Sequence, residues 1–348
     1  MSDRRDCPRL SRRALLRASA GTVTLAAVGS GSAGAAGEGR IGGERALFDR
    51  RCPEATLQPS MGYCEGASTA GCADDHPVTV ALREAVEETL EQEYPDVGAL
   101  VDDGFKPYFD TLDRDDDGWS HWLNPAYIGD DAVLDPERPE SVLVDNDSWR
   151  SIGVMFIATR EGEPIAPPPV YDVDEGVAWM PEAEADALET NEAGGQEGNG
   201  DEMGGEHEGG DRHEPGQEGG DEHEHEHEHP PADDPDRCSP WHYHAGAPGR
   251  FAWWFYQQAY EREFADGDAR VPCRTPCMMH VWTVDHPAGV YAHGGPPPEY
   301  REQPPADDPG LETDARPGED ELDWDVLPEE VTPEERPESI SLGLEDWA

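Results

Sequence analysis

The stretch SVLVDNDSWRSIGVMFIATR, residues Ser141–Arg160, contains two runs typical of β-strands, SVLVDN and SIGVMFIATR. Both are rich in Val and Ile, whose branched side chains pack well against neighbours on a pleated sheet. A similar run, CMMHVWTV, follows much later, at 277–284. Together these runs predict a β-rich core.

Helical periodicity is present on both sides of the strand-like runs. The segment PVTVALREAVEETLEQEY places apolar residues at helical spacing behind Pro77, which predicts an N-terminal helix within 76–104. The segment PDVGALVDDGF adds a short second helix, and GRFAWWFYQQAYEREFADG at 249–267 predicts another. We therefore expect an α+β fold whose β-rich core is a barrel or a sandwich.

Composition divides the chain into five segments. They are a leader at 1–35, a cysteine-containing loop region at 36–75, one globular domain at 76–181 plus 238–295, an insert at 182–237 and an acidic, Pro-rich tail at 296–348. The insert has almost no apolar residues, so we expect it to be disordered, because it cannot offset its ordering entropy. One domain tolerates such an insert, since closure entropy grows slowly with loop length.

The leader resembles a twin-arginine export signal. The pair Arg12–Arg13 stands in SRRALLR, a weakly apolar stretch follows, and Ala33-Gly34-Ala35 offers a cleavage site. The apolar stretch is shorter than the roughly 20 residues that a transmembrane helix needs. We therefore expect an extracellular protein.

The chain is strongly acidic, with a formal net charge of -53, a pI near 4.2 and Lys106 as its only lysine. Such a surface repels itself in dilute buffer, whereas molar salt screens the repulsion. This composition resembles that of haloarchaeal proteins; the alternative is a disordered acidic protein. Nucleic acid and anionic membranes are excluded as partners, because both require a basic face.

Six cysteines remain after the predicted cleavage: Cys52, Cys64, Cys72, Cys238, Cys273 and Cys277. An even number in an exported chain predicts disulfide bonds, although six cysteines allow 15 pairings. In CRTPCMMHVW, the thiols of Cys273 and Cys277 precede Met278, Met279 and His280, a set that also suits copper. We favour disulfides over a copper site there.

Four histidines form the candidate metal site. In WHYH, an extended backbone places His242 and His244 on one face, and His280 lies in a second strand-like run. His121 is a further candidate ligand, whereas His286 and His293 lie in Pro- and Gly-rich loops. Neutral imidazole suits transition metals, and Zn, Cu, Fe or Mn is expected. The alternative is that these histidines only form hydrogen bonds at the edge of an aromatic core.

Another four histidines, His223, His225, His227 and His229, alternate with glutamate inside the insert. Such a tract captures Zn, Ni or Cu loosely, because it supplies no fixed geometry. It is either a flexible metal sponge or a solvated linker.

The run DRDDDG at 113–118 begins like a calcium loop, with Asp113, Asp115 and Asp117 at alternate positions. Its twelfth position is Asn124 in place of a bidentate Glu, and Pro125 opposes an exiting helix. We interpret the run as a solvated acidic turn.

Five segments together resemble a family of exported bacterial and archaeal proteins. They are LREAVEETLEQEYPDVGALVDDGFKPY, HWLNPAYIGDDAVLDPERPESVLVDN, SIGVMFIATR, PWHYH and MHVWTVDHPAGVYAH, covering about 80–160 and 240–293. The resemblance implies an architecture and a histidine site, at His121, His242, His244 and His280, and no reaction. The family often has Asn-Leu-Cys after Trp-His-x-His, a cysteine that is missing here and for which Cys238 is a substitute.

The sequence therefore predicts an exported halophilic protein that binds a transition metal through histidines. A cell-surface structural or interaction protein without metal is the alternative, and a metal-dependent oxidoreductase on a cupin-like barrel is a third hypothesis. The chain contains no Gly-x-Ser-x-Gly or phosphate-loop motif, and outside the Glu-His repeat it contains no His-Glu-x-x-His motif. Catalytic residues, and any small-molecule or protein partner, stay unassigned.

Overall fold

The computed structural model describes residues 52–108, 112, 118–181, 185, 187–188, 234–261, 271–329 and 331–333. The predicted leader lies outside these residues, as do the Glu-His repeat and nearly all of the predicted insert. The aspartates of the calcium-like run, Asp113, Asp115 and Asp117, also lie outside them.

Seven antiparallel strands form the main sheet, in the order β1-β10-β11-β5-β4-β3-β2. The strands are β1 (Met61–Tyr63), β2 (Lys106–Pro107), β3 (Trp119–Leu123), β4 (Ser141–Asp145), β5 (Ser151–Ile157), β10 (His242–His244) and β11 (Met278–Trp282). The predicted β-rich core is confirmed. Within the described residues the sheet is open, with β1 and β2 at its edges, so it does not close into the predicted barrel.

Two small two-stranded sheets accompany the main one. One pairs β6 (Thr159–Arg160) with β7 (Glu163–Pro164), and the other pairs β8 (Tyr171–Asp172) with β9 (Arg237–Cys238). Neither is large enough to form the second layer of a sandwich in the part of the chain that the structure describes.

Strand alternation gives the main sheet two apolar faces. On β5 and β11, Val154 and Val281 join one hydrophobic cluster, whereas Met155 and Trp282 join the other. His280 pairs in register with Met155 on β5. Since side chains alternate along a strand, His280 lies on the face of Met278 and Trp282.

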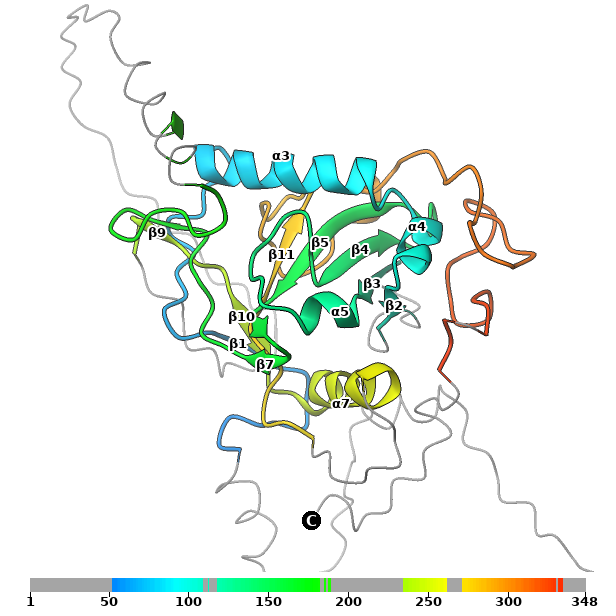
Figure 1. Cartoon of the computed structure of the whole chain (residues 1–348), viewed down its shortest axis with the longest axis horizontal. Helices are drawn as coiled ribbons and strands as arrows, with labels where there is room; N and C mark the ends of the chain where they lie inside the picture. Colours follow the sequence, from blue (N-terminus) through cyan, green and yellow to red (C-terminus); the bar gives the residue numbers. More distant parts are fainter. Residues whose placement is uncertain are drawn as a thin grey trace, which may run out of the picture.

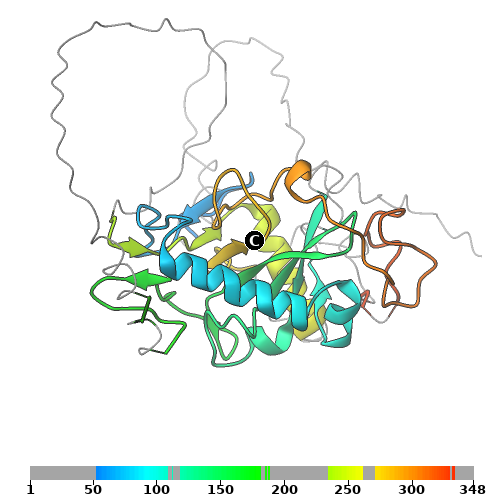
Figure 2. The ribbon, with the colours of Figure 1, turned by 90° about the horizontal axis from the view of Figure 1, so that it is seen from above.

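Helix α3 (Pro77–Gln92) covers one face of the sheet, and α7 (Ala247–Tyr256) lies on the opposite side (Figure 1). Seen from above, α3 runs across the strands (Figure 2). Its buried residues Leu82, Val86 and Leu90 recur every four positions, which makes one apolar stripe toward the sheet. The predicted N-terminal helix is therefore confirmed.

Side-chain caps fix where the two shorter helices begin. Helix α4 (Val97–Asp102) begins where the Asp96 side chain accepts a hydrogen bond from the Ala99 amide. Helix α5 (Pro125–Ile128) is capped by Asn124. The expectation that Pro125 opposes a helix was wrong, because proline is tolerated in the first turn.

Helix α7 places Ala252, Trp253 and Tyr256 in the cluster on its side of the sheet. It continues into a π-helical turn, η1 (Gln257–Glu261). The Tyr256 hydroxyl donates to the carbonyl oxygen of Leu123 on β3 at 3.3 Å. A helix here was predicted, and in the described residues no helix is both long and apolar enough to span a bilayer.

Three disulfide bonds are present: Cys52–Cys273, Cys64–Cys277 and Cys72–Cys238. They confirm the disulfide prediction and leave no thiolate at Cys273 or Cys277 for copper. Each bond ties the N-terminal loop region to a segment at least 166 residues away. The core thus extends beyond the predicted domain on its N-terminal side.

The predicted tail also packs on the domain. Leu322, Trp324 and Val331 are buried in the cluster beneath α3. The turn after β4 holds this segment, because the Ala306 amide donates to the Ser148 carbonyl oxygen at 2.9 Å. Composition alone does not predict this packing, because the tail has few apolar residues and many prolines and carboxylates.

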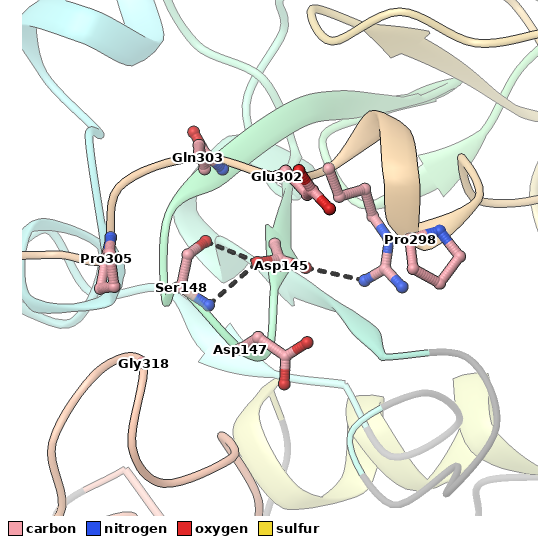
Figure 3. A pocket seen from close by; sticks show the side chains of 9 residues that line it. Asp145, Asp147, Ser148, Pro298, Glu302, Gln303, Pro305 and Gly318 are labelled. Atoms are coloured by element: carbon pink, nitrogen blue, oxygen red, sulfur yellow. Dashed lines mark hydrogen bonds and ion pairs between the residues drawn. The ribbon is translucent and has the colours of Figure 1, made fainter.

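One buried ion pair fixes the tail to that turn. The Arg301 guanidinium donates to Asp145 Oδ1 at 2.8 Å, and both side chains are almost fully buried. The other carboxylate oxygen of Asp145 accepts from the amide and the hydroxyl of Ser148 (Figure 3). Arg301 therefore supplies the positive charge beside the buried carboxylate, and Ser148 supplies two further hydrogen bonds.

We predict that Arg301→Met lowers the free energy of unfolding by about 3–5 kcal/mol, because it leaves the Asp145 carboxylate buried without its cation. Arg316→Met is the matched control: its ion pair with Glu319 is exposed, so we expect a loss of less than about 1 kcal/mol. Denaturant unfolding at high salt measures both. Similar losses in the two variants would contradict this assignment.

Candidate metal centre

The predicted site histidines come from three strands of one sheet. His121 lies on β3, His242 and His244 on β10, and His280 on β11. His121 Nε2 lies 3.2 Å from His280 Nε2, although β4 and β5 separate their strands. This contact requires a strongly curved sheet, and it brings residues about 160 positions apart into one buried cluster.

Three histidines converge as a group that could hold a metal ion. Ligand nitrogens of His242, His244 and His293 all lie within 4.8 Å of one another. Their ring centroids are 5.5 Å apart for His242 and His244, 4.6 Å for His242 and His293, and 5.2 Å for His244 and His293. Nitrogens bound tetrahedrally at ~2.0–2.1 Å from one ion lie roughly 3.4 Å apart, so small ring rotations would complete the geometry.

His242 is prepared for ligation by its surroundings. It is buried, and its Nε2 has no hydrogen-bond partner in the described structure. The ring also hydrogen-bonds to the backbone of Pro240. Burial, and then the neighbouring His293, His244 and His280, hold the pKa of His242 well below its ordinary value. The ring is therefore neutral, which is the form that binds metals.

His280 and His121 form a hydrogen-bonded pair beside this group. His280 Nδ1 lies 3.3 Å from the carbonyl oxygen of Ala292, so it carries the proton and donates. Its Nε2 then accepts from His121 Nε2. Burial, followed by the charge of His293, lowers the pKa of His280 to about 3. The predicted roles of His121 and His280 as ligands stay a prediction, since neither belongs to the converging group.

His293 is the residue that sequence reasoning missed. It lies in the Pro- and Gly-rich loop after β11, which offers no periodicity to place it. The loop turns back along β11, where the Trp282 amide donates to the Val290 carbonyl oxygen at 3.0 Å. A histidine on a short loop returning to a histidine-bearing strand is the signal that could have revealed it.

Three side chains hold the backbone on either side of His293. The Ala292 carbonyl oxygen accepts from Trp282 Nε1 at 2.8 Å and from His280 Nδ1 at 3.3 Å. On the other side, the Gly294 carbonyl oxygen is 3.1 Å from His286 Nε2. These bonds position His293 although it lies outside any helix or strand, a role that outer residues play in metal sites.

A cavity of about 280 Å³ adjoins the three-histidine group. His242 and His293 line it on one side, and Tyr63, Asp74 and Tyr291 contribute to its other walls. The group therefore borders a space large enough for more than water.

Comparison with known proteins gives no match: no protein-family model, no curated protein and no solved structure resembles this chain. The resemblance noted from the motifs consequently stays a prediction, and the chemistry of the site rests on its own geometry.

We predict that Trp282→Phe weakens Zn²⁺ binding about tenfold, because it removes one of the three hydrogen bonds that hold the backbone beside His293. Trp122→Phe is the matched control. Trp122 is also fully buried and donates to Ser120 Oγ at 3.2 Å, but it lies in the cluster on the opposite face. Calorimetric titration of both variants makes the comparison, and equal effects on affinity would show that Trp282 has no positioning role.

Proposed function

We propose that this is an exported protein that binds one transition-metal ion through His242, His244 and His293. The observation that supports this most is the convergence of their ligand nitrogens, together with the buried, unpartnered Nε2 of His242. A buried polar atom without a partner is costly, and a metal ion would remove that cost.

The donor set narrows the choice of metal. Three neutral imidazoles suit Zn, Cu and Fe, whereas Mn prefers carboxylate and water oxygen. Of the four metals expected from the sequence, Mn fits this group least. When bound, the ion would supply a Lewis acid at the border of the cavity.

The neighbouring residues support a built site over a loose one. His280, Trp282 and His286 hold the backbone on both sides of His293 through three hydrogen bonds. The Glu-His repeat of the insert has no comparable support in its sequence. We therefore assign the higher metal affinity to the three-histidine group.

The compartment is part of the same proposal. Three disulfide bonds are typical of an oxidising, extracellular environment. Export by the twin-arginine pathway and adaptation to high salt are proposed from the leader and from the net charge of -53. Of the three ligands, only His242 is buried, whereas His244 is half-buried and His293 is exposed.

A metal-free surface protein is the second candidate. The hydrogen-bonded pair of His121 and His280, packed beside Trp119, favours it, because those histidines need no metal to be satisfied. The buried Nε2 of His242, however, has no hydrogen-bond partner in the described structure, and this favours the metal-binding candidate.

The test uses a full-length chain in which the histidines of the insert cannot bind metal. In this insert-Gln variant, six histidines are replaced by glutamine: His207, His213, His223, His225, His227 and His229. We predict that it carries about one equivalent of metal by elemental analysis, after purification in high salt without a nickel column. Absence of metal in a folded insert-Gln variant would overturn the proposed function.

A second comparison tests the ligand set. Adding His293→Ala to the insert-Gln variant should abolish stoichiometric metal binding, because it removes one of three ligands. His76→Asn is the control: it removes a histidine outside the group and keeps an acceptor for the Val78 amide. Retention of metal after His293→Ala would show that other residues hold the ion.

A further inference from the structure

We propose that the metal bound by His242, His244 and His293 keeps an open coordination position toward the adjoining cavity, and that a small carboxylate binds there. This inference rests on the proposed metal site and deepens it, because it distinguishes a ligand-binding centre from a closed structural one.

The number of ligands leaves a position free. Among the described residues, only His242, His244 and His293 converge. The next imidazole, His280, is engaged at both nitrogens, by His121 and by the Ala292 carbonyl oxygen. Structural zinc sites have four protein ligands, whereas catalytic ones have three protein ligands and a water or substrate.

The cavity fixes the direction of the open position. His242 and His293 line the cavity of about 280 Å³, but His244 does not. An ion bound by all three therefore lies between His244 and the cavity. A fourth ligand would then reach the ion from the cavity.

The charges around the ion favour an anion. Three neutral imidazoles leave the full charge of a divalent ion uncompensated. The chain has 78 Asp and Glu residues, yet Asp74 is the only acidic residue that lines the cavity in the described structure. Its Oδ1 already accepts a hydrogen bond from the Val290 amide at 2.9 Å. The uncompensated charge of the ion therefore favours an anionic oxygen ligand.

The size and the walls of the cavity limit that anion. A volume of 280 Å³ lies just below the range for drug-sized ligands. Met61, Tyr63, Pro240 and Tyr291 line one part of the cavity with apolar and aromatic surface, and polar side chains line the rest. The best fit is a small carboxylate whose carboxylate oxygen reaches the ion and whose apolar portion contacts these walls.

The experiment titrates acetate and benzoate into the Co²⁺-loaded insert-Gln variant and follows the visible absorption of Co²⁺. Molar sodium sulfate replaces chloride, since chloride would compete for the open position. We expect a saturable spectral change with both acids, and benzoate should bind at least several-fold more tightly because of the apolar walls.

Ala288→Trp blocks the cavity without altering a histidine, because Ala288 is an exposed lining residue. It should retain Co²⁺ and lose the response to both acids. Ala126→Trp, an exposed position on α5 outside the cavity, should respond like the parent.

Each outcome has a distinct meaning. If neither acid changes the Co²⁺ spectrum, the metal site is closed. That result overturns this inference and leaves the proposed metal site intact. A normal response in Ala288→Trp means that the anion does not enter through this cavity, and it overturns the inference equally. Failure to bind Co²⁺ at all would remove the proposed metal site and this inference with it.

Discussion

Covalent attachment of the N-terminal segment to the histidine-bearing strands is the constraint on which the rest of the structure depends. Strand β10 is three residues long, and its register with β11 consists of the single pair His242 and Met278. Its other neighbour is β1, which pairs with it along three residues. The disulfide Cys64–Cys277 ties the end of β1 to the start of β11, and Cys72–Cys238 ties the following loop to β9, which precedes β10 in the chain. They add covalent links to the hydrogen bonds by which Thr275 holds both the amide and the carbonyl oxygen of His244.

The sequence predicted the elements whose packing is repetitive. Strands β4, β5 and β11 are apolar runs, and α3 has an apolar stripe, so residue periodicity was sufficient to find them. His242 and His244 could be assigned to one face for the same reason, because alternation is a local property of a strand. The β-rich core and the presence of disulfides were likewise predictable.

What the sequence could not predict depends on contacts between distant residues. His293 was passed over because its loop has no periodicity, and its position depends on bonds from Trp282 and His280 to Ala292. The tail was taken for an appendage, although the buried Arg301–Asp145 pair and Trp324 join it to the domain. Disulfide pairing and the curvature that brings His121 to His280 are also properties of the folded chain alone.

The central claim is that three imidazoles from β10 and the loop after β11 bind one ion. X-ray absorption spectroscopy of the Zn²⁺-loaded insert-Gln variant tests it most directly, because the spectrum counts imidazole ligands around the metal. We predict three imidazole nitrogens at ~2.0–2.1 Å and one oxygen ligand. A first shell of oxygens without imidazole scattering would contradict the account, since it would assign the ion to the carboxylates of the acidic surface.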